Sequence, residues 1–314
     1  MNKIAIQGIK GSNHYLVAQN YFGAEIELHE FLSFDKLVDC IIAENCDYGI
    51  MALENTIAGS IIPNYALIDH NQLTICGEYY LNIHHHLMAL PNQSINDIQE
   101  VCSHPMALLQ CKEFFKQHKH IKLVEDVDTA EVAERISKKQ LKNVAAIAPK
   151  VAADLFDLEV IEDEIQTIKN NATRFVIVQK RDVSTALDMT NGESANMEAA
   201  DVTLSLSKGL EAGVNKASLK FELDHKRGSL AAMLNVMSDC KLNLTKIQSL
   251  PKIETPWKYA FFVDVTFEDY KEYAKAKAII EIMALDFKIL GEYTNGRPHS
   301  GSGKLEDEKV KIAE

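Results

Sequence analysis

Apolar and polar positions alternate along the first 180 residues in a way that predicts successive strands and helices. Residues 3–7 form a short apolar run, residues 8–11 hold two glycines, and apolar side chains then recur at helical spacing from Ser12 onward. Residues 48–53 have the composition of a buried strand, and polar residues 54–56 follow it directly. This alternation predicts an α/β architecture with largely parallel sheets.

Two further helix starts are predicted between residues 100 and 150. Ser103 is a suitable N-cap, and Pro105 would then stand in the first turn of its helix. Asp128 and Glu131 have the spacing of a capping box for the next helix. The first of these helices would carry an apolar stripe of Ala107, Leu108, Cys111, Phe114 and Phe115. Short strands are expected at residues 144–148 and 175–179.

The pattern changes at residues 181–214, which are rich in Ser, Asn, Glu and Gly. We interpret this stretch as a linker or a decorated strand, with a weak strand candidate at residues 202–206. Residues 215–295 then follow the order βαββαβ, which is that of a ferredoxin-like unit. The polar tail, residues 296–314, is expected to be disordered. The predicted elements of the βαββαβ unit cover residues 217–223, 228–237, 242–249, 257–267, 270–285 and 287–293.

The negative net charge of the chain limits the kinds of ligand that it is expected to bind. The 314 residues are 46% hydrophobic and 25% charged, with a formal net charge of −12. Nucleic acids and anionic membranes are bound through basic surfaces, so neither is an expected partner. An acidic protein that binds an anionic substrate needs a local positive charge, which draws attention to Arg174.

The cysteines and the N-terminus indicate an intracellular protein. The six cysteines include no C-x-x-C pair and no zinc-like spacing, so we expect reduced core residues. Residues 1–8 read as a strand that enters a glycine turn rather than as a signal peptide, and the chain has no apolar span of 18 residues. A cytoplasmic enzyme or sensor is the expectation. The cysteines are Cys40, Cys46, Cys76, Cys102, Cys111 and Cys240.

The triplet His84-His85-His86 suggests a metal site at first sight. It lies in a strand-like context, where consecutive side chains face opposite ways, so the three imidazoles cannot bind one ion. We expect a structural role for these histidines and no metal in the protein.

Residues 171–175, Asn-Ala-Thr-Arg-Phe, place an amide, a hydroxyl, a cation and an aromatic ring at the start of a strand. One interpretation is an ordinary strand entry, with Thr173 and Phe175 on the face opposite Arg174. The other is a site for a small anion, in which a hydroxyl lies beside a positive charge. The motif alone favours the first interpretation, because short polar motifs often occur by chance.

Four separated motifs together resemble the prephenate dehydratase family. They are Gly8-x-x-Gly11-Ser12, Leu53-Glu54-Asn55-Thr56-x-x-Gly59, Ser103-His104-Pro105-x-Ala107-Leu108-x-Gln110-Cys111 and Asn171-x-Thr173-Arg174-Phe175. Downstream, the segments Gly228-Ser229-Leu230, 243–251 and 259–264 are similar to the regulatory ACT domain of that family. The resemblance implies a catalytic region of two α/β lobes like a periplasmic binding protein, with its site between the lobes, and an ACT domain that binds phenylalanine. It also implies no metal or organic cofactor, and assembly as a homodimer or homotetramer.

The resemblance implies a role for each matching residue. The family reaction expels a ring hydroxyl and carbon dioxide from prephenate and leaves the aromatic phenylpyruvate. Thr173 would donate a hydrogen bond to the departing oxygen, and Arg174 would grip a substrate carboxylate. If both lay in regular strand, alternation would point Arg174 away from Thr173, and Arg174 would then be structural. The other substrate-binding candidates are Phe175, Asn171, Asn55, Thr56, Glu54, Gly11, Ser12, Ser103 and His104; the effector candidates are Gly228, Ser229, Leu230, Asn243, Leu244 and Ser249.

The chain also departs from the family pattern. Thr56 replaces a Ser, Met106 replaces a Gln, and Thr167 stands where an Asp is frequent. Residues 248–251, Gln-Ser-Leu-Pro, replace the regulatory Glu-Ser-Arg-Pro, which removes one anion and one cation. Two alternatives stay open: an arogenate dehydratase, which performs the same chemistry on the amino-acid analogue, and a non-catalytic sensor of a small ligand.

Overall fold

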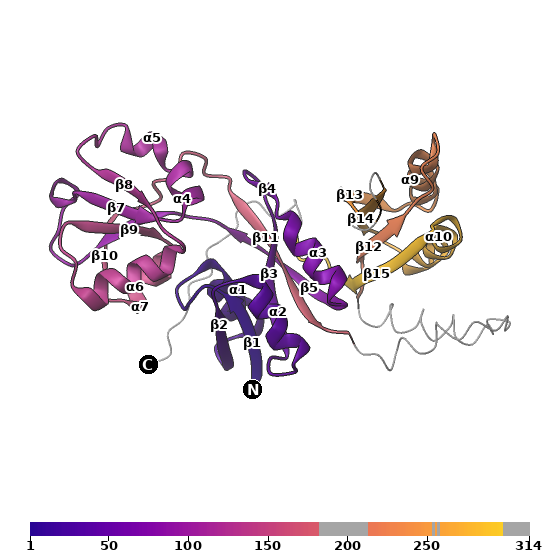
Figure 1. The fold of residues 1–314 in the computed structure, drawn as a ribbon, viewed down its shortest axis with the longest axis horizontal. Coiled ribbons are helices and arrows are strands. Elements are labelled where there is room, and N and C mark those ends of the chain that lie inside the picture. The colour runs from indigo at the N-terminus through magenta and orange to yellow at the C-terminus, as the bar shows by residue number, and fades with distance from the viewer. Residues whose placement is uncertain (182–212, 253–254, 256–257, 298–314) are drawn as a thin grey trace.

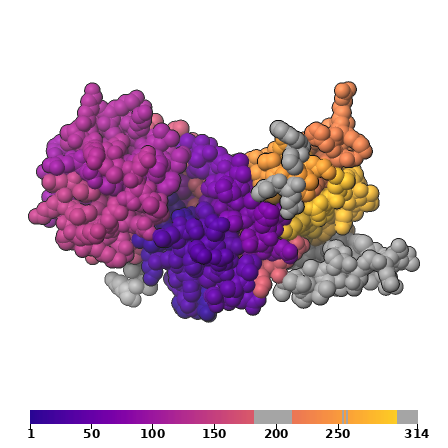
Figure 2. Space-filling model, in the orientation of Figure 1, coloured from indigo at the N-terminus to yellow at the C-terminus, as the bar shows by residue number. Residues whose placement is uncertain are grey.

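The computed structural model describes residues 1–181, 213–252, 255 and 258–297. Its strands form three sheets, which define a first lobe, a second lobe and a C-terminal unit. The first lobe lies in the middle, with the second lobe on one side and the C-terminal unit on the other (Figures 1 and 2). Most of the predicted linker, its strand candidate at residues 202–206, and residues 298–314 of the tail lie outside the described residues.

The sheet of the first lobe has the strand order β2-β1-β3-β11-β5, with β4 paired to β3. Helix α1 begins after Ser12, whose hydroxyl accepts the Tyr15 N–H, and α2 begins after Ser33 in the same way. The elements of this lobe are β1 (Asn2–Gln7), α1 (Asn13–Phe22), β2 (Ile26–Phe31), α2 (Phe34–Ile42), β3 (Tyr48–Asn55), β4 (Gly59–Ser60), α3 (Ile62–His70), β5 (Leu73–Asn82) and β11 (Ala172–Lys180).

The sheet of the second lobe has the order β10-β6-β9-β7-β8. The chain enters this lobe after β5 and leaves it before β11, so two crossing segments join the lobes (Figure 1). The elements are β6 (His86–Ala89), the 3₁₀ turn η1 (Ile95–Asp97), β7 (Glu100–Ser103), α4 (Pro105–Gln110), α5 (Lys112–Phe115), β8 (Lys122–Glu125), α6 (Thr129–Lys139), β9 (Val144–Ala148), α7 (Lys150–Leu155) and β10 (Glu159–Glu162).

The expectation of largely parallel sheets is wrong. β1 is parallel to β2 and β3, and β7 is parallel to β8 and β9, but β11 is antiparallel to both its neighbours. β6 is likewise antiparallel to β9 and β10. The physical reason is the route of the chain: β11 returns from the second lobe and inserts between β3 and β5 in the opposite direction, which local periodicity does not reveal.

The C-terminal unit confirms the predicted βαββαβ order. Its antiparallel sheet has the order β13-β14-β12-β15, with α9 and α10 as its helices. α9 begins after Gly228, which has a φ of 86° and so a conformation that glycine adopts most easily. The elements are β12 (Lys216–Glu222), α9 (Ser229–Asp239), β13 (Asn243–Pro251), β14 (Tyr259–Thr266), α10 (Tyr270–Met283) and β15 (Asp286–Tyr293).

The helix predicted after Ser103 begins one residue later. Ser103 is the last residue of β7, and His104 is the N-cap, with its Nδ1 accepting the Met106 N–H at 3.2 Å. Pro105 explains the shift, because the residue before a proline is held out of the helical region. Asp128 caps α6 as expected, accepting the N–H groups of Ala130 and Glu131.

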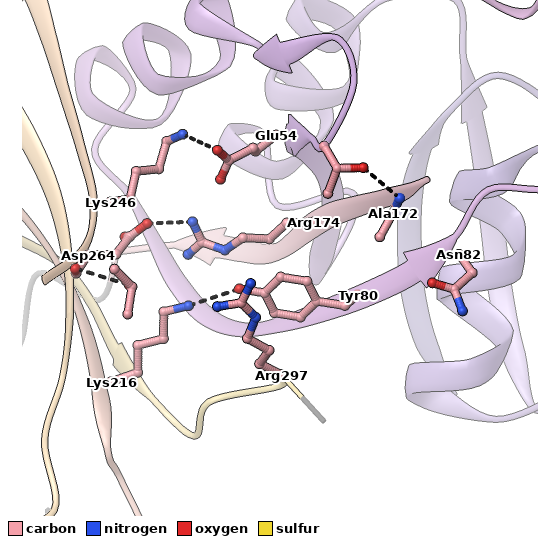
Figure 3. Close-up of a pocket in the computed structure, with 11 residues that line it drawn as sticks. Glu54, Tyr80, Asn82, Ala172, Arg174, Lys216, Lys246, Asp264 and Arg297 are labelled. Carbon is pink, nitrogen blue, oxygen red and sulfur yellow. Dashed lines mark hydrogen bonds and ion pairs between the residues drawn. The ribbon is translucent and has the colours of Figure 1, made fainter. Parts of the chain in front are cut away.

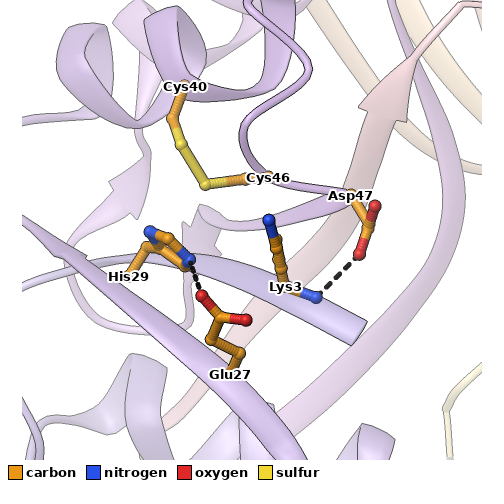
Figure 4. Close-up of a disulfide and its surroundings, with 6 residues drawn as sticks. All are labelled: Lys3, Glu27, His29, Cys40, Cys46 and Asp47. Carbon is orange, nitrogen blue, oxygen red and sulfur yellow. Dashed lines mark hydrogen bonds and ion pairs between the residues drawn. A yellow bond between two sulfur atoms is a disulfide. The ribbon is translucent and has the colours of Figure 1, made fainter. Parts of the chain in front are cut away.

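The expectation that all six cysteines are reduced is also wrong. Cys40, near the end of α2, and Cys46, in the following loop, form a disulfide (Figure 4). Their Cα atoms lie 5.5 Å apart, because the chain turns back directly after α2. His29 lies close enough to the two sulfur atoms to suggest a metal site, but the sulfurs are joined to each other, so only the imidazole remains as a ligand. The other four cysteines are free.

None of the helices in the described ranges has the length and apolar character needed to cross a bilayer.

The C-terminal unit and the first lobe share one hydrophobic core. Ala260, Phe262 and Leu290 belong to the same buried cluster as Tyr65 and Val176 of the first lobe. Strands β15 and β5 approach so closely that a Cβ at Gly291 would lie 2.1 Å from the Ile75 carbonyl oxygen. The two units therefore pack as one body at this junction.

Replacing Gly291 with Ala is expected to lower the free energy of unfolding by about 1–3 kcal/mol, because the added methyl group forces two backbones apart. Urea denaturation of the variant and the wild type measures the difference. A variant as stable as the wild type would contradict the close packing of β15 on β5.

Candidate active site

Thr173 is the second residue of β11. This strand begins where the chain returns from the second lobe to the sheet of the first (Figure 1). Asn55, the last residue of β3, is the partner of Thr173 across the ladder. Asn55 Nδ2 donates to Thr173 Oγ1 at 2.9 Å and to Asn171 Oδ1 at 2.7 Å. Because Thr173 Oγ1 accepts this hydrogen bond, its own proton stays available to a ligand.

The orientation of the Asn55 side-chain amide is fixed by backbone N–H groups that follow it in the chain. Asn55 Oδ1 accepts the N–H groups of Ile57 and Ala58 at 2.9 and 2.8 Å, so Nδ2 must face Thr173. Thr56 lies beside it and accepts the Ala172 N–H at 3.0 Å, which ties the end of β3 to the start of β11. The hydroxyl of Thr173 is thus presented by a rigid strand pair.

The hydrogen bonds continue into the second lobe. Asn171 Nδ2 donates to Gln110 Oε1 at 2.9 Å, and His85 Nε2 lies 2.7 Å from the same oxygen. An amide oxygen only accepts, so His85 carries its proton on Nε2. Burial lowers the pKa of His85, which keeps the imidazole neutral near pH 7. Thr173, Asn55, Asn171, Gln110 and His85 together form what we call the junction network.

The glycine turn before α1 also lies where the lobes meet. A Cβ at Gly11 would lie 3.3 Å from Ala152 and Phe156 of the second lobe, and one at Gly8 would lie 3.0 Å from Asp128. Ser12 is almost fully buried. Not every backbone N–H of the turn is free to bind an anion, since the Lys10 N–H donates to the carboxylate of Glu30 at 2.7 Å.

Ser103 and His104 have different environments. Ser103 is fully buried, and its O–H donates a hydrogen bond to the Ile147 carbonyl at 2.8 Å. This O–H is therefore not available to a substrate. His104 is exposed at the start of α4. Asp128, assigned by the sequence only to capping, presents a carboxyl opposite the glycine turn, and burial raises its pKa.

Three predicted substrate-binding residues lie elsewhere. Arg174 faces the C-terminal unit, and its guanidinium contacts Asp264 and Tyr293 of that unit and Glu78 of the first lobe. Glu54 faces the same way and pairs with Lys246 at 2.7 Å. Phe175 packs in the core of the first lobe, 5.0 Å from the ring of His14. Strand alternation explains the first two, because Arg174 and Glu54 point to the face opposite Thr173 and Asn55. Phe175 is on the same face as Thr173 but is buried in the hydrophobic core.

A polar cavity of about 410 Å³ lies on the Arg174 face of β11 (Figure 3). Glu54 and Arg174 reach into it from the first lobe, and Lys216, Lys246 and Asp264 from the C-terminal unit. Thr173 does not line this cavity, whereas its neighbours Ala172 and Arg174 do. The cavity is therefore separated from the junction network by the strand itself.

The family model for prephenate dehydratase matches residues 4–183, a range that contains the whole junction network. The chain belongs to the prephenate dehydratase family. The dehydratase is accordingly a carbon–oxygen lyase. A relative named bifunctional chorismate mutase/prephenate dehydratase, from Enterobacter agglomerans, is 28% identical over 303 residues, which cover 93% of this chain and 70% of the relative.

Two solved structures share the fold of this chain. One, the prephenate dehydratase of Arthrobacter aurescens in complex with L-Phe, has a TM-score of 0.77 at 20% identity, covering 94% of this chain and 90% of that one. The other, described as GqqA, a novel type of quorum quenching acylases, has a TM-score of 0.76 at 22% identity, covering 93% and 98%. At these identities the likeness shows the fold, and the activity of the dehydratase rests on the family match.

Sequence reasoning missed Gln110 and His85 as members of the network. Gln110 stands in a motif used for the resemblance but received no role, and His85 was grouped with its neighbours. In the structure the three histidines take three different partners: His84 contacts Glu164, His86 contacts Asp163, and His85 contacts Gln110. His85 differs from its two neighbours in its partner, because Gln110 connects it to Asn171 and through Asn171 to Asn55.

His14 is a buried histidine beside β11. It packs edge-on against Phe34 and Phe175, and its Nε2 has no hydrogen-bond partner among the described residues. Burial lowers its pKa to about 3. The unfolded chain, with an ordinary histidine pKa, binds a proton below pH 6.5 that the folded protein refuses, so stability falls as pH drops from about 6.5 toward 3.

We expect the free energy of unfolding of the wild type to fall between pH 7 and pH 5 by about 2 kcal/mol more than that of a His14→Phe variant. The variant keeps the aromatic packing and loses the titrating group. Urea denaturation at the two pH values measures both slopes. Equal slopes would show that His14 is protonated as easily in the folded protein as in the unfolded chain.

In the part of the chain that the structure describes, the predicted effector residues Ser229 and Leu230 line a different cavity from Asn243. Ser229 and Leu230 line a cavity of about 120 Å³ at the start of α9, whereas Asn243 lines another of about 620 Å³ beyond its end. Leu244 packs against the core of the C-terminal unit, and Ser249 pairs with Phe261 of β14.

Proposed function

We propose that the dehydratase converts prephenate to phenylpyruvate at the junction between its two lobes. The observation that carries this proposal is the oriented Thr173 hydroxyl, whose oxygen accepts from Asn55 and whose proton remains available. The network behind it reaches both lobes, so closure of the lobes on a substrate would set the position of this donor.

The reaction breaks two bonds in one molecule. The bond from the ring to its carboxylate breaks to release carbon dioxide, its electron pair enters the ring, and the ring hydroxyl leaves and is protonated to water. Aromatisation drives the process, so the enzyme has to stabilise the departing oxygen. A hydrogen bond from Thr173 to that oxygen strengthens as negative charge develops, and one such donor commonly contributes on the order of 10²- to 10³-fold.

The substrate carboxylates need partners other than Arg174, because its guanidinium is occupied. Ser12 and Gly11 at the start of α1, and His104 at the start of α4, are the candidates that lie toward the lobe junction. Ser12 Oγ accepts the Tyr15 N–H, so its own O–H can donate a hydrogen bond to a substrate carboxylate. Asn171 remains a candidate through its place in the network.

The test is to incubate the purified protein with prephenate or with arogenate and to follow phenylpyruvate and phenylalanine. Formation of phenylpyruvate from prephenate supports the proposal. Turnover of arogenate alone would assign the same chemistry to the amino-acid analogue, and binding of either compound without turnover would make the chain a sensor. The cytoplasm remains the predicted location.

We also infer that the C-terminal unit is an ACT domain that binds L-phenylalanine between two copies of the chain. The βαββαβ order and the exposed edge strand β13 support this inference, since an edge strand can pair with a second copy. Such pairing would allow Gly228, Ser229 and Leu230 of one copy to combine with Asn243 and Leu244 of the other.

Phenylalanine is expected to bind and to inhibit with reduced sensitivity or incompletely. Leu250 stands where the family has an arginine, and here it packs against the core at the junction with the first lobe. Losing the charges at positions 248 and 250 removes part of a coupling that is typically about 1–3 kcal/mol. Calorimetric titration with phenylalanine, together with activity at saturating phenylalanine, measures binding and coupling separately. Absence of binding heat at millimolar phenylalanine would contradict the effector site.

A further inference from the structure

Strand β11 presents its first residues to two different parts of the molecule. Thr173 faces the junction network and contacts Asn55, whereas Arg174, the next residue, faces the C-terminal unit. Both residues are buried, and both are paired on two sides, with β3 and with β5. A shift of Arg174 therefore moves Thr173, because one peptide unit joins them and a strand is stiff along its length.

The guanidinium of Arg174 uses three nitrogen atoms on three partners. Nε donates to Glu78 at 2.7 Å, one terminal nitrogen donates to Asp264 at 2.5 Å, and the other donates to the hydroxyl of Tyr293 at 2.8 Å. Glu78 is on β5 of the first lobe, while Asp264 and Tyr293 are on β14 and β15 of the C-terminal unit. We call these four residues the arginine clamp (Figure 3 shows two of them, Arg174 and Asp264).

Further donors complete the clamp. Lys216 of β12 donates to both oxygens of Glu78, at 2.9 and 2.8 Å. Ser218 donates to Asp264 at 2.5 Å, and the Gly296 N–H donates to Glu78 at 3.0 Å. Burial opposes ionisation of Asp264, but Arg174, Ser218 and Lys216 outweigh it, so the pKa of this carboxyl is lowered.

The charges of the clamp are nearly inaccessible to water. The side chains of Arg174 and Asp264 are 3% and 4% exposed, and that of Glu78 is 0% exposed. A buried charge network is favourable only when its geometry is closely met, because every misplaced partner leaves a charge without solvation. The clamp therefore specifies one position of β11 relative to the C-terminal unit.

We propose that Arg174 is a positioning residue for catalysis: by holding the start of β11 against the C-terminal unit, it fixes the place of the Thr173 hydroxyl. This proposal rests on the proposed function of Thr173. It assigns Arg174 no contact with substrate, and it makes the C-terminal unit part of the structure that aligns the active site. Any change in that unit that moves Asp264 or Tyr293 would move Arg174 and, with it, the adjacent Thr173.

The test changes the clamp from the side of the C-terminal unit. Asp264→Asn keeps the shape of the side chain and removes its charge, and Tyr293→Phe removes only the hydroxyl. A misplaced donor affects the chemical step, so we expect kcat to fall about tenfold for Asp264→Asn and about threefold for Tyr293→Phe, with KM unchanged in both. Should Asp264→Asn fail to fold, the milder Tyr293→Phe carries the test.

A matched control breaks an ion pair at the same junction that does not touch β11. Lys288 of β15 pairs with Asp69 of α3 at 2.8 Å. Lys288→Gln should leave kcat and KM unchanged even where it lowers the melting temperature. A fall in kcat equal to that of the clamp variants would overturn the proposal, because any weakening of the junction would then suffice.

The assays also distinguish failure of the positioning role of Arg174 from failure of the proposed function. A wild type that produces no phenylpyruvate overturns both. An active wild type whose clamp variants keep full kcat overturns the positioning role alone. A raised KM with unchanged kcat would show that Arg174 binds substrate, and it would likewise overturn the positioning role.

Discussion

Replacing Thr173 with Ala is expected to lower kcat by about 100-fold or more, with little change in KM. In the proposed function this hydroxyl donates to the departing oxygen, and the described contact that its removal breaks is the hydrogen bond from Asn55. The folded structure should survive, since an alanine methyl fits the same strand position. Steady-state formation of phenylpyruvate from prephenate, alongside urea denaturation, measures the two effects separately.

Thr173→Ser is the matched control for this prediction. It keeps the hydroxyl and removes only a methyl group, so its kcat should stay within about tenfold of the wild type. A Thr173→Ala variant with activity within threefold of the wild type would remove Thr173 from the chemical step.

Replacing Arg174 with Met is expected to lower the free energy of unfolding by about 3–5 kcal/mol. The variant leaves Glu78 and Asp264 buried with only Lys216 to balance them. Urea denaturation at pH 7 measures the loss. The size of this effect distinguishes a buried charge cluster from an arginine that waits for a substrate carboxylate.

An exposed ion pair provides the control. Lys36 and Asp39 of α2 lie 3.0 Å apart with side chains that are 70% and 67% exposed, so Lys36→Met should cost less than about 1 kcal/mol. If Arg174→Met were no more destabilising than Lys36→Met, the clamp would contribute nothing to stability. The expectation from the resemblance, that Arg174 binds a substrate carboxylate, would then be favoured.

Much of the fold follows from local patterns. The caps at Ser12 and Asp128 and the βαββαβ order near the C-terminus could all be predicted, because each depends on residues within a few positions of one another. The N-cap at His104 could also have been predicted, since Pro105 excludes a helical conformation before it. The disulfide of Cys40 and Cys46 depended on the turn at the end of α2, which six residues of sequence do not define.

The candidate active site, like the fold, was predictable from the sequence only where it depends on neighbouring residues. The sequence predicted that Thr173 and Arg174 face opposite ways, and that Arg174 is structural, only on the condition that the start of β11 is regular strand. It did not determine which face met the other lobe. The partners of Arg174 lie 96, 90 and 119 positions away, and Gln110 lies 61 positions from Asn171. Only the tertiary structure brings such groups together, because contacts across long stretches of chain depend on how the sheets pack and not on the period of the residues within them.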